Sequence, residues 1–174
     1  MPLHQEESFM SFLKNLFGGQ GNKKPANGPM PTRGLNLQFI PTPDNGHRFA
    51  QQFVDAVKNN DRIELDYSVG TLQFVDKFLQ RFSDEGLAVD DFAETIFVAG
   101  AYVGEVIIKN NDGTWLRQED ANLPKGIVMT PIVVKLSNGN ITDPIAKAFK
   151  RFHYGDTDNI NYFYHVFTQD KPPS

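Results

Sequence analysis

The chain has 174 residues, of which 40% are hydrophobic and 22% are charged, so its composition is that of an ordinary globular domain. Seventeen basic and 21 acidic side chains leave a net charge of −4, which argues against a nucleic-acid-binding protein. The chain has no cysteine, which excludes disulfides, thiolate metal sites and thiol nucleophiles.

The expected location follows from the hydropathy of the chain. No apolar run reaches the roughly 20 residues needed to span a bilayer. The first residues include His4, Glu6 and Glu7, whereas a secretory leader has a positive start before a continuous apolar stretch. We therefore expect a soluble, cytoplasmic protein.

A short amphipathic helix is predicted in residues 1–17. Its apolar residues follow the spacing of one helical face: Phe9, Phe12, Leu13, Leu16 and Phe17. A helix of about ten residues is too short to be stable alone, so the segment must dock on another surface. The surfaces that compete are its own domain, a second copy or partner protein, and a membrane. Because Glu6 and Glu7 offset part of the nearby lysine charge, membrane contact would be weak, and we expect a protein partner or self-association through residues 9–17.

The remainder of the chain divides into a linker and a domain. Residues 18–34 are rich in glycine and proline and almost free of apolar side chains, which predicts a flexible linker. Residues 35–174 are predicted to form a single α+β domain, with helices packed around a central apolar helix and a small antiparallel sheet. An internal repeat or a regular strand–helix alternation, which would favour a doubly wound sheet, is not visible.

The first half of the domain is predicted to be mainly helical. Alternating apolar and polar residues over 35–40 predict a half-buried strand. Stripes of apolar residues at helical spacing then predict helices over 47–59, 68–82 and 90–109. The third helix is apolar around most of its girth, so it should lie at the centre of the domain.

The second half is predicted to contain the sheet and two more helices. A strand is expected over 114–118, and the β-branched run from Ile127 to Val134 predicts one or two more, with Pro131 marking a bulge or a sheet edge. Asp143 followed by proline is typical of a helix N-cap. Residues 159–169 fit both a strand and a helix, and we prefer the helix.

Several motifs with known chemistry are incomplete. The glycines at 18–21 follow no strand and complete neither of the two common phosphate-binding spacings. Asp156 opens a sequence like a calcium loop, but Ile160 and Phe167 stand where oxygen ligands are needed. The four histidines have no metal-ligand spacing, and no serine lies in a nucleophile elbow. No metal or cofactor is therefore expected.

The most informative position is Glu105, which interrupts a nearly continuous apolar stretch. A buried carboxylate is costly unless it is paired or hydrogen-bonded, so Glu105 should have a partner. The preferred hypothesis is a structural tie, either to backbone amides of another element or to a cation, for which the candidates are Arg62 and Lys147. The alternative is a catalytic acid or base in a cleft. Its candidate neighbours are Asp66, Tyr102 and His153.

Two glycines and one tryptophan accompany Glu105. Gly100 and Gly104 lie four residues apart, which leaves one helical face without side chains. We expect another element to pack closely there, in preference to a ligand groove. Trp115, the only tryptophan, is predicted to cover the end of the central helix. Asp66 and Ser68 offer oxygens to the first amides of the helix that follows them.

These segments together resemble a bacterial family of small domains of unknown function. The family pattern is Leu-Asp-x-Ser, a helix, Gly-x-Tyr-Leu-Gly-Glu-Val and a Gly-x-Trp turn. The matching residues here include Asp66, Ser68, Gly100, Tyr102, Gly104, Glu105 and Trp115. Val103 replaces the usual leucine. The resemblance covers residues 62–116 and implies that these elements form one continuous fold, but it implies no activity.

Two classes of function are open. We favour a non-catalytic binding or protein-interaction module of unknown ligand, because the sequence contains no recognisable nucleophile, metal cluster or phosphate loop. The alternative is an enzyme that uses Glu105 and Asp66 as acid and base. A deep pocket that holds Glu105 with a second titratable group would favour the enzyme, and a filled environment would favour the module.

Overall fold

The structure is a computed structural model that describes residues 28–124 and 130–169. The helix predicted in residues 1–17, residues 18–27 of the predicted linker, and Ile127 with Val128 lie outside these ranges. The helices and strands in chain order are α2 (Gly46–Asp61), α3 (Leu72–Asp84), α4 (Val89–Asn111), β1 (Gly113–Arg117), β2 (Ile132–Leu136), β3 (Ile141–Thr142), α5 (Pro144–Tyr154) and α6 (Ile160–Thr168).

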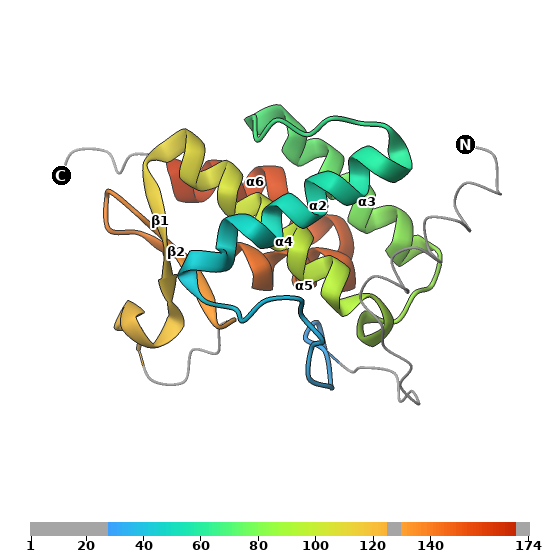
Figure 1. Ribbon diagram of the computed structural model, residues 1–174, viewed down its shortest axis with the longest axis horizontal. Helices are drawn as coiled ribbons and strands as arrows, with labels where there is room; N and C mark the ends of the chain where they lie inside the picture. The colour runs from blue at the N-terminus through green and yellow to red at the C-terminus, as the bar shows by residue number, and fades with distance from the viewer. Residues whose placement is uncertain (1–27, 125–129, 170–174) are drawn as a thin grey trace.

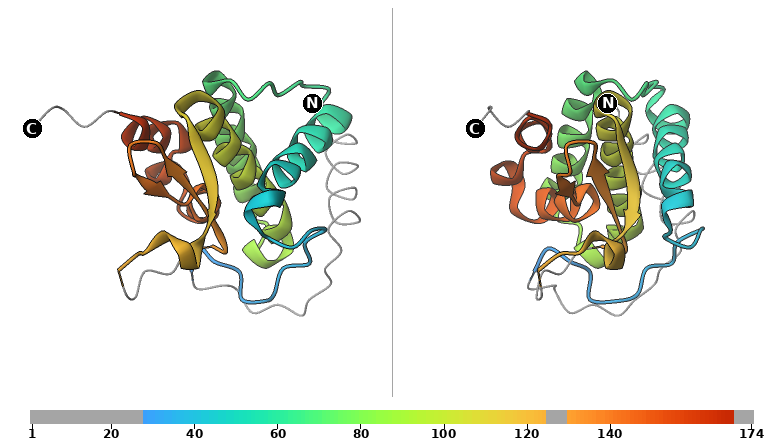
Figure 2. Two further views of the ribbon diagram at one scale, coloured as in Figure 1. Left: turned by 60° about the vertical axis from the view of Figure 1, so that its left-hand side comes forward. Right: turned by 90° about the vertical axis from the view of Figure 1, so that its left-hand side faces the viewer.

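Helix α4 is the centre of the fold. Every residue from Phe92 to Ile107 is buried, because neighbouring elements cover the helix around its whole girth. Helix α2 lies on one side of α4, and α5 and α6 lie on the other side (Figures 1 and 2). The apolar girth of this segment therefore predicts its central place correctly.

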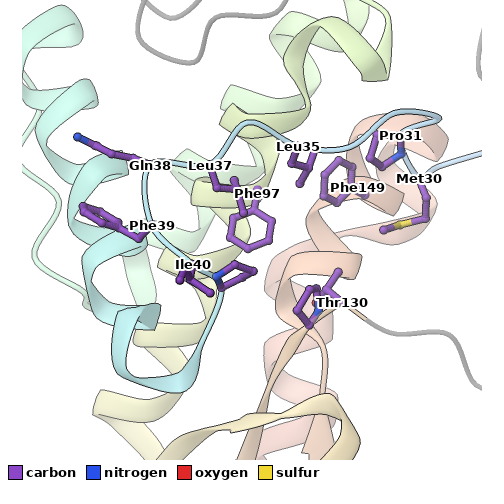
Figure 3. Close-up of a pocket in the computed structure, with 12 residues that line it drawn as sticks. Met30, Pro31, Leu35, Leu37, Gln38, Phe39, Ile40, Phe97, Thr130 and Phe149 are labelled. Atoms are coloured by element: carbon purple, nitrogen blue, oxygen red, sulfur yellow. The ribbon is translucent and has the colours of Figure 1, made fainter.

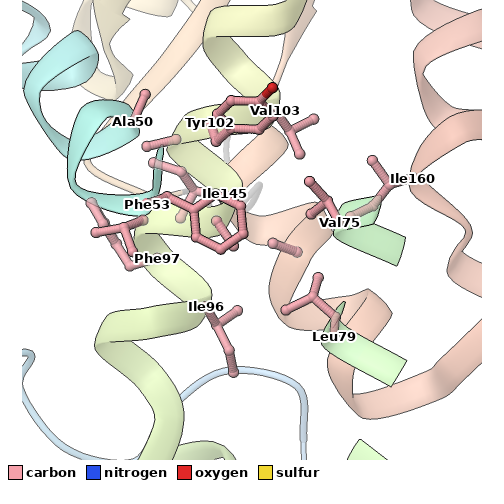
Figure 4. Close-up of a cluster of buried hydrophobic side chains, with 14 of the residues drawn as sticks. Ala50, Phe53, Val75, Leu79, Ile96, Phe97, Tyr102, Val103, Ile145 and Ile160 are labelled. Atoms are coloured by element: carbon pink, nitrogen blue, oxygen red, sulfur yellow. The ribbon is translucent and has the colours of Figure 1, made fainter. Parts of the chain in front are cut away.

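The hydrophobic core surrounds α4 and receives side chains from all the neighbouring helices (Figure 4). Representative buried residues are Phe53 from α2, Leu79 from α3, Tyr102 from α4, Ile145 from α5 and Ile160 from α6. Each large apolar side chain that is removed from water contributes about 1.5–3 kcal/mol, so the helices are held mainly by this shared core.

The small sheet follows α4 directly and completes the α+β fold. Strand β1 pairs antiparallel with β2, where Trp115 lies opposite Val134, and β2 pairs antiparallel with β3. Strand β2 begins immediately after Pro131, whose carbonyl accepts a hydrogen bond of 3.0 Å from the Gln118 amide. Proline therefore marks the start of the strand, consistent with its lack of an amide donor.

The predicted strand at 35–40 is wrong. The side chains there alternate between half-buried and exposed, but among the described residues the sheet consists of β1, β2 and β3 only. The Asn36 amide donates instead to the buried Glu94 carboxylate, at 2.8 Å. The alternation correctly shows which side chains face the core, but it does not supply a strand edge for pairing.

The end of the predicted linker is bound to α4. Arg33 forms a two-pronged hydrogen bond with Glu94, with Nη1–Oε1 at 2.6 Å and Nη2–Oε2 at 2.8 Å. Its Nε also donates to the Asp90 carbonyl at 3.0 Å, and the Thr32 amide donates to Asp90 Oδ1 at 2.7 Å. Residues 32 and 33 therefore belong to the folded part of the chain, which a composition dominated by glycine and proline does not reveal.

The two predicted C-terminal helices are confirmed. Asp143 is the N-cap of α5, and its Oδ1 accepts a hydrogen bond of 2.8 Å from the Ala146 amide. The same carboxylate binds the Thr130 amide and hydroxyl at 2.7 and 2.8 Å, which ties the start of α5 to the chain before β2. The ambiguous last segment is helix α6, with Asn159 as its cap.

Candidate functional site

Glu105 is buried on α4, where its side chain is bonded to the sheet. Only 7% of the residue is exposed, and Oε1 accepts a hydrogen bond of 2.8 Å from Nε1 of Trp115. The expected partner therefore exists, but it is neither of the candidate cations. Lys147 pairs with Asp158 at 2.7 Å, and Arg62 is the exposed residue that ends α2.

Glycines form the slot that holds the Trp115 indole. A Cβ atom at Gly104 would lie 2.5 Å from Cζ2 of Trp115, and one at Gly46 would lie 2.6 Å from Cε2. A Cβ atom at Gly100 would lie 2.5 Å from Cα of Ile145, so the start of α5 packs on α4 with almost no intervening side chain. The close packing expected at Gly100 and Gly104 is thus present, and the indole occupies part of it.

A hollow of about 510 Å³, which we call the polar hollow, opens beside Glu105. Its lining residues come from the segment before α2, from α2, from the loop after α2 and from α4. They are Gln38, Phe39, His47, Arg48, Gln51, Gln52, Asp55, Tyr67, Glu105 and Lys109. The hollow therefore gathers two carboxylates, two permanent cations, one histidine and two aromatic rings.

Tyr67 is held in the wall of this hollow by its backbone. Its φ angle of 62° is left-handed, which is strained for a residue with a bulky side chain. The Tyr67 amide donates to the Tyr102 hydroxyl at 3.1 Å, and its carbonyl accepts from Asn110 Nδ2 at 2.9 Å. Burial, and secondly the charge of Glu105, raise the pKa of Tyr67 to about 12, so its phenol stays protonated at neutral pH.

The structure does not bring the predicted catalytic neighbours to Glu105. Among the described residues that line the polar hollow, Asp66, Tyr102 and His153 are absent. Asp66 is exposed, and hydrogen bonds from Ser68 hold the pKa of Asp66 below its ordinary value. Tyr102 is fully buried, with its hydroxyl 2.7 Å from Thr71 Oγ1. The hydrogen bond that Asp66 makes is local, because its Oδ1 accepts from the amide of Ser68, two residues later, at 2.9 Å.

The residues that do accompany Glu105 were missed by sequence reasoning. Arg48, Gln51, Gln52 and Asp55 lie at helical spacing on α2 and form one polar stripe of that helix. Such a stripe is usually a solvated face, so the sequence signal is present but unspecific. The stripe forms a hollow together with Glu105 only because α4 lies beside α2.

A second hollow is apolar and lies between residues 30–41 and the two helices α4 and α5. This apolar groove has a volume of about 590 Å³. Its lining includes Met30, Leu35, Leu37 and Ile40 from residues 30–41, and Phe97, Phe149 and Thr130 from other parts of the chain (Figure 3). Pro131 also lines it. Ile40 is 74% exposed at its edge. The Thr130 hydroxyl is already hydrogen-bonded to Asp143, which leaves Gln38 as the other polar lining side chain among the described residues.

In residues 28–124 and 130–169, no three His, Asp or Glu side chains form a group able to hold a metal ion. None of the described helices combines the length and the apolar character needed to cross a membrane. Comparison of the chain with protein-family models, with curated proteins and with solved structures finds no match. The resemblance of residues 62–116 to a bacterial family therefore stays a prediction.

Proposed function

We propose that the protein is a non-catalytic protein-interaction module whose apolar groove binds an amphipathic helical segment. The observation that carries this proposal is an open groove of about 590 Å³ with mainly apolar walls and a strongly exposed Ile40 at its edge. Pockets of about 300–1,000 Å³ with apolar walls are typical of binding sites, and exposed apolar surface of this kind marks sites of association.

The occupant that we propose is residues 9–17 of this chain. Their stripe of phenylalanine and leucine requires an apolar surface, because a helix of that length is not stable in water by itself. The described chain begins at Gly28, two residues before Met30 on the wall of the groove. The covalent connection between this segment and the groove is therefore short.

The linker length permits this docking. The twelve residues from 18 to 29 span at most about 40 Å when extended, and a flexible linker of that length has an average span of about 20 Å. The segment thus reaches the groove of its own molecule at a local concentration in the millimolar range. The same length allows exchange with a second copy, which would produce self-association.

The charge of the groove favours a protein segment over a lipid surface. Among the described residues that line it, no lysine or arginine is present. Attraction to anionic lipid depends on such cations, whereas an apolar helical face needs only complementary apolar walls. A membrane is therefore the weaker alternative.

The test uses the absence of cysteine in the chain. Ser8→Cys introduces a single thiol, to which an environment-sensitive fluorophore is attached in the full-length protein. We expect the emission of a dye in an apolar surrounding, and a shift toward that of the free dye when Ile40→Glu places a charge in the groove. Ile63→Glu, at another exposed isoleucine outside the groove, is the matched control. Equal emission for all three proteins would contradict the proposal.

We also infer a bacterial, cytoplasmic protein. The support is the resemblance of residues 62–116 to a bacterial family and the lack of cysteine in the sequence. Fractionation of cells that express the chain with its natural start tests this location, and recovery in a membrane or exported fraction would contradict it.

A further inference from the structure

The Glu105 carboxylate is only half satisfied. Its Oε1 accepts from Trp115, but within residues 28–124 and 130–169 its Oε2 has no hydrogen-bond partner. This oxygen is also not one of the buried polar atoms that are fully enclosed without a partner. Because Glu105 lines the polar hollow, we infer that Oε2 faces the open space.

The cations of the described residues do not pair with this carboxylate. In the described parts of the chain, Glu105 takes part in no ion pair. Arg48 lies over the Phe39 ring at 3.7 Å, and Lys109 lies over the Tyr67 ring, with Nζ 4.9 Å from the ring centroid. Both cations line the hollow but rest on aromatic faces. A carboxylate that is nine-tenths buried therefore lacks a counter-charge.

The hollow contains donors on Arg48, Lys109 and His47, but in residues 28–124 and 130–169 none of them bonds to the Glu105 carboxylate. The Tyr67 hydroxyl is already committed as a donor to Gln51 Oε1 at 3.1 Å. The group that complements an unpaired carboxylate oxygen carries a hydrogen-bond donor and a positive charge. An ammonium group has three donors and no acceptor.

We propose that the polar hollow is a binding site for a primary ammonium group, with Glu105 as its anionic partner. The lining is balanced in permanent charge, because Glu105 and Asp55 face Arg48 and Lys109. A ligand that also carries a carboxylate can therefore place it at the cationic rim. The ligand class is a free amino acid or the amino terminus of a peptide, which share the ammonium group. This site is separate from the apolar groove, with which it shares only Gln38 and Phe39 among the described lining residues.

The single tryptophan provides a direct reporter, because its indole N–H is bonded to the carboxylate in question. The indole ¹H–¹⁵N signal of the full-length protein is followed while glycinamide, glycine or N-acetylglycine is added at constant ionic strength. We expect saturable shifts with glycinamide and glycine, with dissociation constants of about 1–10 mM for ligands of this size. N-acetylglycine, which has no ammonium group, should produce no shift beyond that of sodium chloride.

The relative affinities of glycine and glycinamide distinguish a free amino acid from the amino terminus of a peptide. Glycine that binds more tightly than glycinamide indicates a free amino acid, because the carboxylate then adds affinity. Equal or weaker binding of glycine indicates a peptide terminus, whose first carbonyl resembles that of glycinamide. If neither probe shifts the signal, or if N-acetylglycine shifts it equally, the proposal is overturned.

Variants locate the site. Glu105→Gln keeps an oxygen for the indole but removes the charge, so it should weaken glycinamide binding at least about tenfold. The exposed Glu85→Gln is the matched control and should bind like the wild type. Lys109→Met removes a competing exposed cation and should tighten glycinamide binding about two- to fivefold, and this test stands even if Glu105→Gln fails to fold. Unchanged binding in Glu105→Gln, or unchanged or weaker binding in Lys109→Met, would contradict the assignment.

Discussion

The indole of Trp115 and the carboxylate of Glu105, two buried residues, join the sheet to the central helix by one hydrogen bond of 2.8 Å. Gly46 and Gly104 leave the space that the indole fills. A hydrogen bond to a charged group is stronger than one between neutral groups, and leaving such a group without its donor is costly. Strand β1 is therefore fixed against α4 at this point.

Trp115→Phe should destabilise the domain by about 2–3 kcal/mol, because it leaves Glu105 Oε1 without a donor and reduces packing against the glycines. The free energy of unfolding is measured by urea titration. Tyr162→Phe, at a largely exposed ring, is the control and should change it by less than about 0.5 kcal/mol. An unchanged midpoint for Trp115→Phe would show that the bond contributes nothing.

Gly104→Ala should also be destabilising, although alanine is the better helix former by about 1 kcal/mol. The added Cβ atom would lie 2.5 Å from Cζ2 of Trp115 and 3.1 Å from Cγ of Pro144, so we expect a net loss of about 1–3 kcal/mol from overpacking. Gly70→Ala, where a Cβ atom meets nothing within 4 Å, is the control. If thermal melts show Gly104→Ala to be as stable as the wild type, the indole slot is wider than described.

Arg33→Ala should cost about 3 kcal/mol at pH 7, because it leaves Glu94, which is 2% exposed, without its cation. Deletion of residues 1–34 should carry the same cost. Deletion of residues 1–27 keeps Arg33 and is the reference for this comparison, so it should be more stable than the deletion of residues 1–34 by about the same 3 kcal/mol. Guanidinium titration compares the three proteins, and equal stability of the two truncations would contradict a structural role for Arg33.

The same ion pair predicts an acid dependence. Burial raises the pKa of Glu94, but hydrogen bonds from Arg33 and Asn36 outweigh it and hold the pKa below the ordinary 4.5. A carboxyl group with a lowered pKa contributes stability that is complete above the unfolded-state pKa and is lost as the pH falls through the folded-state pKa. The difference in unfolding free energy between wild type and Arg33→Ala should therefore shrink below about pH 4.5. A difference that stays constant to pH 3 would argue against the charge of Glu94.

Glu105→Gln should lower the pKa of Tyr67 from about 12, because the carboxylate charge is the second cause of its elevation after burial. The raised pKa stabilises the fold below pH 10, the ordinary value, and this contribution is lost as the pH rises through about 12. Ultraviolet titration measures the phenolate, with Tyr67→Phe subtracted to isolate this ring. An unchanged midpoint would place Glu105 too far from Tyr67 to act on it.

The helices of this fold are predictable because their apolar stripes are long and unmixed. The stripes at 47–59 and 90–109 locate α2 and α4 to within two residues at each end. Residues 35–40 mislead because alternation reports which side chains face inward, whereas strand pairing also requires a neighbouring edge. The pairing of Arg33 with Glu94 crosses 61 residues of sequence, and no local pattern encodes such a contact.

The candidate site was predictable in part. The need of Glu105 for a partner follows from burying a charge in an apolar helix. The identity of Trp115 as that partner depends on how β1 folds back along α4, which the sequence does not specify. The polar stripe of α2 lines a hollow only because Glu105 and Lys109 of α4 lie beside it in the folded protein.

The docking of residues 9–17 in the apolar groove is tested most directly by paramagnetic relaxation. A spin label on Ser8→Cys in the full-length, isotope-labelled protein should broaden the NMR signals of Ile40 and Phe97, which line the groove, and spare those of Ile63. A second sample contains two kinds of chain: one carries only the spin label, and the other carries only the isotope label. Broadening in this mixture shows that the segment comes from a second copy. Broadening at Ile40 and Phe97 in either sample is the predicted result. Signals at Ile40 and Phe97 as sharp as the signal of Ile63 in both samples would contradict the account.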